Sequence, residues 1–163
     1  MPRKCREEVA GGVYHVFARG VRRRPIFLDD GDCQVYLVIL RGVIAVFGWR
    51  VLSYCLMTNH VHLVIETPYP NLARGMQRLH GHYGRHFNCR HERSGHLFER
   101  RYGRNPIEDD VQLHATLAYV AANPVDAGLC LRPEDWRRSS YAASIGVRDD
   151  YCVDLERLRE LSS

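Results

Sequence analysis

The residues with the clearest chemical potential lie in the stretch MTNHVHLVIE, residues 57–66. His60 and His62 are two residues apart within a run of β-branched and aliphatic residues that predicts a strand. Side chains alternate between the faces of a strand, so both imidazoles are expected on one face, together with Glu66. Two imidazoles side by side can bind one divalent cation. The alternative is that both histidines are ordinary polar residues of a sheet, with Glu66 solvated beside them.

A second pair of reactive residues lies in the segment LHATLAYVAANP, where Tyr119 and Asn123 are four residues apart. A helix would place them on one face. A phenol and an amide oxygen beside two imidazoles suit phosphoryl transfer, in which a cation draws charge from a phosphodiester and the phenol attacks phosphorus. The phenol needs a nearby cation or base to react at neutral pH, and its phosphotyrosine product would allow rejoining without ATP. Alternatively, Tyr119 is a core residue with its hydroxyl at the rim, and Asn123 only stops the helix.

Apolar patterns predict the elements that position these residues. A first strand is expected at residues 13–18. It is followed by a helix that an aspartate of LDDGD (Asp29, Asp30 or Asp32) caps and that Gly48 closes. A second strand at 49–57 would pair with the histidine strand as an antiparallel hairpin. Strand, helix, strand, strand is the opening half of a ferredoxin-like fold.

Three- and four-residue apolar spacing then predicts a second helix over 72–87. Gly75, Gly81 and Gly84 each weaken it by roughly 1 kcal/mol, so packing or a ligand must support it. A short strand is expected over 96–102, where Phe98 and Tyr102 would offer stacking platforms for nucleic acid.

A third helix is expected to begin at IEDD and to stop at or before Asn123, because Pro124 follows. A closing strand or loop and a short helix over 154–161 complete the chain. These elements predict an α+β fold, a ferredoxin-like antiparallel sheet of about four to five strands with packed helices. We expect one domain over residues 9–146, with polar terminal segments at 1–8 and 147–163.

The chain's 163 residues and 45% hydrophobic content fit one compact domain. No apolar run approaches the ~20 residues of a membrane span, and the charged start MPRKCREEVAGG has no apolar region behind it, as a secretory signal would. We therefore expect a cytoplasmic protein. Its six cysteines are scattered, which favours free thiols over a zinc module.

Arginine dominates the basic residues, since Lys4 is the only lysine. The net charge is +4, but residues 71–104 hold eight arginines against Glu92 and Glu99. Guanidinium groups match phosphates and base edges, so this segment favours a polyanionic partner. The alternative is a solvated basic face in an arginine-rich protein.

Five motifs occur together in a fixed order: YHVFARGVRRRPIF, MTNHVHLV, GHLFERRY, AYVAANPVDAGL and WRRSSY. This combination resembles the REP-associated tyrosine transposases, a branch of the single-tyrosine HUH transposase superfamily, over roughly residues 12–143. The resemblance implies a five-stranded antiparallel HUH-type sheet and cleavage and rejoining of single-stranded DNA through a 5′-phosphotyrosine. It implies Tyr119 as the nucleophile, with His60, His62 and Asn123 as ligands of Mg²⁺ or Mn²⁺.

The same resemblance implies a hairpin substrate, formed by a repeated palindrome with a short guide sequence beside it. We expect single-stranded or hairpin DNA as the partner, no membrane, and either a monomer or a homodimer. The residues expected to hold the DNA backbone are arginines: Arg19, Arg22, Arg23, Arg24, Arg74, Arg78, Arg85, Arg100, Arg101 and Arg104.

Two other functions are open at this point. A non-catalytic single-stranded nucleic-acid-binding module on the same fold would use the basic helix and aromatic side chains without metal. A rolling-circle initiator nuclease or relaxase would share the chemistry, but such functions normally come with larger chains or a helicase partner.

Overall fold

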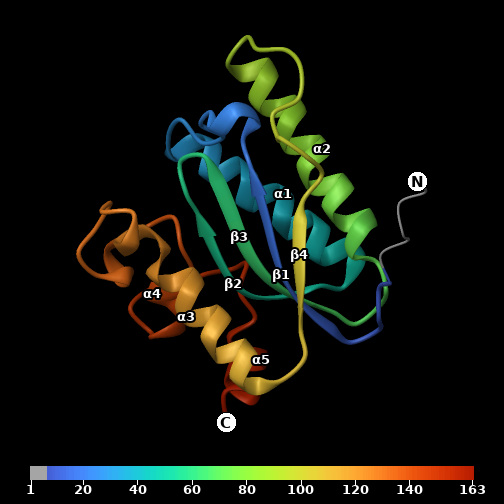
Figure 1. Cartoon of the computed structure of the whole chain (residues 1–163), viewed down its shortest axis with the longest axis vertical. Helices are drawn as coiled ribbons and strands as arrows, with labels where there is room; N and C mark the ends of the chain where they lie inside the picture. The colour runs from blue at the N-terminus through green and yellow to red at the C-terminus, as the bar shows by residue number, and fades with distance from the viewer. Residues whose placement is uncertain (1–6) are drawn as a thin grey trace.

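The structure, a computed structural model, describes residues 7–163. Its centre is a four-stranded antiparallel sheet with the strand order β2-β3-β1-β4, so the first strand of the chain is an inner one (Figure 1). The strands are β1 (Gly12–Arg19), β2 (Arg50–Leu56), β3 (His60–Thr67) and β4 (Gly103–Ile107). The predicted α+β class with an antiparallel sheet is confirmed, with four strands where the family resemblance implied five.

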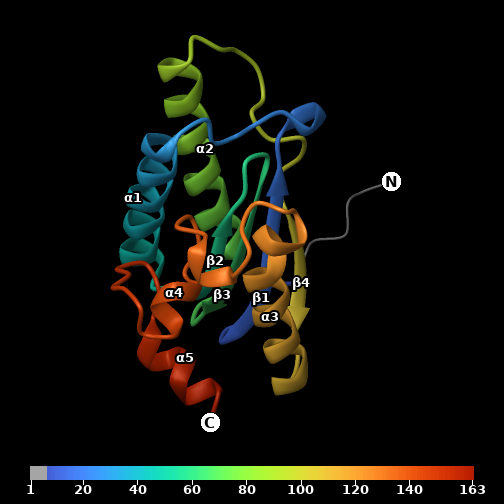
Figure 2. The same cartoon turned by 90° about the vertical axis from the view of Figure 1, so that its left-hand side faces the viewer.

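Helices cover both faces of the sheet, as Figure 2 shows with α1 at the left and α3 at the right. The helices are α1 (Asp30–Phe47), α2 (Leu72–Arg90), α3 (Asp110–Asp126), α4 (Tyr141–Ser144) and α5 (Leu155–Leu161). The main core lies between α1, α2 and one sheet face, through side chains such as Val16 and Leu63. A smaller core lies between α3 and the other face, around Val64, Leu113 and Val120. This division follows from strand alternation, which sends neighbouring residues to opposite faces.

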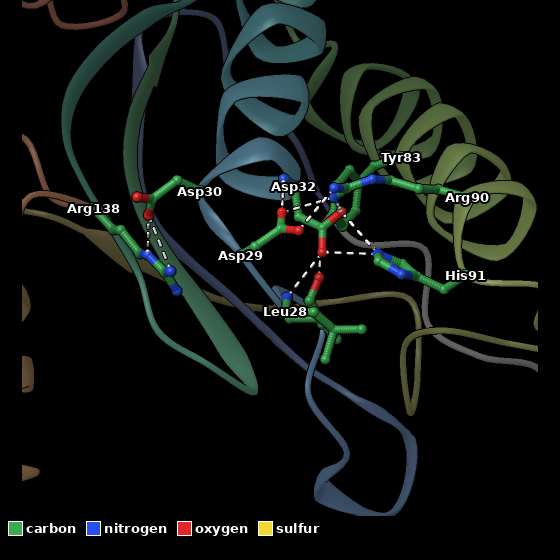
Figure 3. Close-up of polar contacts among 9 residues, drawn as sticks. Leu28, Asp29, Asp30, Asp32, Tyr83, Arg90, His91 and Arg138 are labelled. Atoms are coloured by element: carbon green, nitrogen blue, oxygen red, sulfur yellow. Dashed lines mark hydrogen bonds and ion pairs between the residues drawn. The ribbon is translucent and has the colours of Figure 1, made fainter.

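Polar contacts clamp the start of α1 to the end of α2 (Figure 3). The Asp29 carboxylate caps α1 by accepting a hydrogen bond from the backbone amide of Asp32 (2.9 Å), and Gly48 closes the helix in the left-handed conformation. The fully buried Asp32 carboxylate accepts hydrogen bonds from Leu28 N (2.8 Å) and Arg90 Nη1 (2.6 Å). Two helices distant in sequence are therefore joined at one end by a charged cluster.

The glycine at position 75 explains how α2 tolerates its weak propensity. A Cβ at Gly75 would lie 2.0 Å from Trp49 Cζ2, so only glycine lets the indole pack directly on the helix backbone. The expectation that packing supports this helix is confirmed at this position.

Helix α3 begins with a variant of the capping box, in which Gln112 accepts from the residue before the N-cap, and runs further than the sequence predicted. Asp109 accepts from Gln112 N (2.7 Å), while Gln112 Oε1 accepts from Glu108 N (3.0 Å). The helix continues past Pro124 to Asp126, so the prediction that it stops at or before Asn123 is wrong. Proline removes a single N–H from the ladder, and the amide of Ala127 still donates to Asn123 O (3.0 Å).

The end of α3 is set four residues after the proline. Gly128 adopts a positive φ of 71°, and the amide of Leu129 donates to Pro124 O (2.9 Å) while that of Gly128 donates to Val125 O (2.9 Å). This pair of bonds is the Schellman arrangement that glycine commonly closes.

Two predicted strands reduce to single bridges. Residues 96–102 do not form a strand: Phe98 bridges only to Gly20, and β4 starts at Gly103. The segment instead turns its apolar side chains onto the main core. In the segment between α3 and α4, Ser139 makes a single bridge to Cys55 of β2, so the loop alternative describes this region.

The C-terminal segment, expected to be polar and outside the domain, packs on it. Cys152 and Val153 are buried, and Val153 bridges to Val51 of β2. The expected short helix is present as α5, and Arg157 on it holds Glu66 with two hydrogen bonds (2.8 and 3.0 Å). Glu66 is therefore buried and ion-paired, not solvated.

The five cysteines among residues 7–163 are free, and three of them are buried; Cys5 lies outside the described residues. Within the same range, no helix combines the length and apolarity needed to cross a membrane.

Candidate active site

The sheet face toward α3 carries polar residues in cross-strand rows. Arg19 pairs with His60, and the next row contains His62, Phe17 and Gly103. His15 lies one row further, opposite Asn105. Because β1 and β3 alternate in step, the histidine strand and the central strand point these side chains to the same side. The sequence prediction that His60 and His62 share a face is consistent with this register.

His60 is oriented by two asparagines. Asn59 Nδ2 donates to Arg23 O (3.2 Å), which turns Asn59 Oδ1 toward His60 Nδ1 at 2.7 Å. Asn123 Nδ2 donates to Tyr119 O (3.3 Å), which turns Asn123 Oδ1 toward His60 Nε2 at 3.3 Å. A neutral imidazole has one N–H, and the shorter contact places it on Nδ1. His60 Nε2 and Asn123 Oδ1 then face each other as two acceptors, an arrangement that a cation between or beside them would stabilise.

His62 is held from the central strand. His15 Nε2 and His62 Nδ1 share a hydrogen bond of 2.9 Å, and both side chains are buried. Burial lowers the pKa of His62 to about 3, and the neighbouring His15, His60 and Arg19 lower it further because each would repel a second positive charge. Burial also lowers the pKa of His15 and of His60, the latter against an opposing contribution from Asn123. All three imidazoles are therefore neutral at pH 7, the state in which histidine can bind a metal.

Helix α3 brings Tyr119 against the histidines of its own chain. The Tyr119 ring stands edge-on to His62, with centroids 5.5 Å apart, and to His15 at 5.8 Å. The side chain is 51% exposed. Tyr119 is thus not the core residue of the alternative interpretation, since its ring borders solvent above the imidazoles.

These residues line a cavity of about 690 Å³ between α3 and the sheet. Two arginines, Arg19 and Arg100, also line it, together with one acid, Glu99. Among residues 7–163, no three His, Cys, Asp or Glu side chains come together as a metal site. The amide oxygen of Asn123, 3.3 Å from His60 Nε2, is a further oxygen that can coordinate a cation beside the two histidines.

The other eight predicted DNA-binding arginines lie outside this cavity. Arg74, Arg78 and Arg85 are on α2, which covers the opposite face of the sheet. Arg104 is turned away as well, since its guanidinium lies 5.2 Å from the Tyr14 ring centroid and donates to Glu7 O (2.6 Å). The four remaining side chains are exposed: Arg22, Arg23, Arg24 and Arg101.

The aromatic platforms predicted from the sequence are used in packing. Phe98 stacks on His80 with centroids 4.0 Å apart, and Tyr102 is buried. His15 and Phe17 lie beside the histidine pair in the structure, and neither was predicted from the sequence as a site residue. Alternation within YHVFARG could have put both on one face, but nothing in the segment indicated which strand would lie next to it.

Comparison with known proteins decides the family. Residues 8–123 match the family described as "Transposase IS200 like". The chain belongs to the IS200-like transposases. The tyrosine-transposase resemblance of the motifs is thereby confirmed.

The fold of this IS200-like transposase is also that of a solved REP-associated tyrosine transposase bound to a REP hairpin. The two share 14% identity with a TM-score of 0.73, over 94% of this chain and 98% of the other. A candidate transposase from Deinococcus radiodurans R1 aligns with 17% identity and a TM-score of 0.49, over 73% and 94% of the two chains. No curated protein matches the sequence.

Proposed function

We propose that this transposase is a metal-dependent single-stranded DNA endonuclease and strand transferase that acts on hairpin-forming DNA through a 5′-phosphotyrosine. One observation carries the proposal. A single helix sets Asn123 Oδ1 3.3 Å from His60 Nε2 and the Tyr119 ring 5.5 Å from that of His62. The REP hairpin bound to the solved relative supports DNA as the partner.

His60, His62 and Asn123 would hold the cation, Mg²⁺ or Mn²⁺. Bound there, it supplies positive charge to the non-bridging oxygens of a phosphodiester. Imidazole and amide oxygen are ligands that both ions accept. Asn59 and His15 fix the two imidazoles from behind, through their Nδ1 atoms.

Tyr119 would be the nucleophile. Its hydroxyl oxygen forms a bond to phosphorus, the 3′-oxygen leaves as a hydroxyl, and the 5′-phosphate stays on the phenol. A second 3′-hydroxyl then attacks the phosphotyrosine, which joins the strands and restores the phenol. Arg19 and Arg100 line the same cavity and would hold the backbone phosphates on either side.

The test uses 5′- and 3′-labelled single-stranded hairpins from palindromes flanking the gene, incubated with Mn²⁺, Mg²⁺ or EDTA and separated on denaturing gels. We expect a metal-dependent nick with protein attached to the 5′ end. Tyr119→Phe should bind the hairpin without cutting it, whereas the matched control Tyr151→Phe, an exposed tyrosine outside the cavity, should cut as wild type does.

A nick by Tyr119→Phe protein would show that another group is the nucleophile. Hairpins that wild-type protein retards but never cuts, in either metal, would favour the non-catalytic binding module.

A further inference from the structure

The cavity extends beyond the catalytic side chains onto β1 and β4, where Phe17, Gly103 and Asn105 form its floor. None of these residues has a part in the phosphoryl transfer proposed above. We infer that this floor is a nucleobase pocket, in which a base next to the scissile phosphate stacks on Phe17 and is read by Asn105. The inference rests on the proposed function, whose substrate it narrows.

Phe17 is presented to the cavity by a glycine. Gly103 is its register partner on β4, and a Cβ added there would lie 2.1 Å from Phe17 Cε2 and 2.2 Å from Cζ. The ring therefore lies across the strand, over the Gly103 backbone, where any larger residue would displace it. A ring that lies over bare backbone offers its other side to the cavity that it lines.

The Phe17 ring is incompletely covered by the protein. It is only half-buried, its ring neighbour being His15 at 5.4 Å with a tilt of 47°. Flat aromatic side chains of this kind accept bases by stacking, whatever the base, because each base has a π-face. With Phe98 and Tyr102 used in packing, Phe17 and Tyr119 are the aromatic rings that line the cavity.

Asn105 supplies a polar group at the edge of this platform. It is two residues beyond Gly103 on β4, hence on the same face, and its exposed side-chain amide makes no hydrogen bond to any residue from 7 to 163. A free amide has a donor and an acceptor side by side, the pair that asparagine uses to bind the edge of adenine. The pocket should therefore prefer adenine.

The remaining lining selects a nucleotide over a free apolar ligand. Arg19 and Arg100 supply positive charge for the phosphates on either side of the base, against the single carboxylate of Glu99. The volume of about 690 Å³ lies within the range of small-ligand sites, so one nucleotide can enter beside the catalytic residues.

The test starts from Tyr119→Phe protein, which should hold DNA without cutting it. A fixed hairpin from the flanking palindromes, with randomised single-stranded flanks, is selected on this protein in Mn²⁺. Each nucleotide of the preferred strand is then replaced by an abasic residue. We expect one abasic position, next to the phosphate that wild-type protein cuts, to weaken binding about 5- to 100-fold.

In Phe17→Leu Tyr119→Phe protein, the same abasic substitution should weaken DNA binding by less than about twofold, because the aromatic ring on which the base would stack is already absent. Asn105→Ala, a change at an exposed position, should keep the abasic penalty but lose the preference for adenine at that position. Tyr151→Leu is the matched control and should behave as its parent.

The proposed pocket is wrong if the abasic substitution weakens binding equally with and without Phe17. It is also wrong if the Tyr119→Phe protein selects no preferred strand, or if no abasic position weakens its binding. Nicking by wild-type protein separates this failure from that of the proposed function. Cutting without a Phe17-dependent penalty removes only the pocket, whereas a penalty without cutting leaves the pocket and removes the catalysis.

Discussion

His15 Nε2 lies 2.9 Å from His62 Nδ1, so the central strand holds an imidazole of the neighbouring strand through a buried hydrogen bond. Asn59 holds His60 at the equivalent atom, at 2.7 Å. Both Nε2 atoms are thereby left for the cavity. The two imidazoles are thus oriented in the same way, each by a hydrogen bond at its Nδ1 atom, although the partner side chains come from different segments.

His15→Phe should weaken Mn²⁺ binding about 10- to 100-fold, the usual effect of removing a residue that orients a metal ligand. His15→Gln keeps a polar group in reach of His62 and should recover part of the affinity. Calorimetric titration with Mn²⁺ measures the effect, and thermal melting checks that the variants fold. Equal Mn²⁺ affinity in wild-type and His15→Phe protein would contradict a positioning role.

Helix α3 docks on the histidines of its own sheet in the structure, so we expect each chain to complete its own site. Tyr119→Phe and His62→Ala proteins should each fail to nick hairpin DNA, and a mixture of the two should fail as well. Restored nicking in the mixture, followed on denaturing gels, would mean that copies exchange α3 in solution.

The cluster that joins α1 to α2 should make stability depend on acid. Burial raises the pKa of Asp32, but hydrogen bonds from Leu28, His91 and Arg90 outweigh it and hold the pKa below 3.8. A carboxyl with a lowered folded pKa stabilises the protein above its unfolded value, and that contribution disappears as the pH falls through the folded value. Asp32→Asn should therefore cost roughly 2–3 kcal/mol at pH 7 and progressively less below pH 3.8.

Urea unfolding at a series of pH values measures this difference. Asp30→Asn is the matched control, because Asp30 is exposed and its pair with Arg138 (3.0 Å) lies at the surface. It should change the unfolding free energy by less than about 1 kcal/mol. A cost for Asp32→Asn that does not vary with pH would exclude the carboxylate charge as its origin.

The C-terminal helix should contribute to stability through one ion pair. Arg157→Met removes both hydrogen bonds to the buried Glu66 while keeping the apolar stem, and should cost about 1.5–3 kcal/mol. Arg159→Met, on the exposed side of α5, should cost less than about 0.5 kcal/mol. Combining Arg157→Met with Glu66→Gln in a double-mutant cycle isolates the pair, and additive costs would show that the two side chains are uncoupled.

The local sequence pattern was sufficient to predict which site residues share a face when they lie within one strand or helix. The alternation of β3 predicted that His60 and His62 share a face, and the four-residue spacing of Tyr119 and Asn123 predicted the same for α3. The extent of α3 was misjudged, because the effect of Pro124 depends on the Schellman bonds around Gly128.

Contacts between distant elements could not be predicted in this way. His15 and Phe17 reach the site because β1 pairs with both β3 and β4, and strand pairing leaves no trace in local periodicity. The distance of Arg74, Arg78 and Arg85 from the cavity could not be predicted either. Local periodicity does not show which face of the sheet α2 covers.

Placing the first strand inside the sheet has a consequence for protein synthesis. A nascent chain that has left the ribosome as far as β3 already carries His15, His60 and His62. It lacks β4, which borders β1, and the helix that brings Tyr119 and Asn123. Under the proposed function, unfinished chains therefore cannot cut DNA, and translation itself withholds the nuclease until most of the protein has been made.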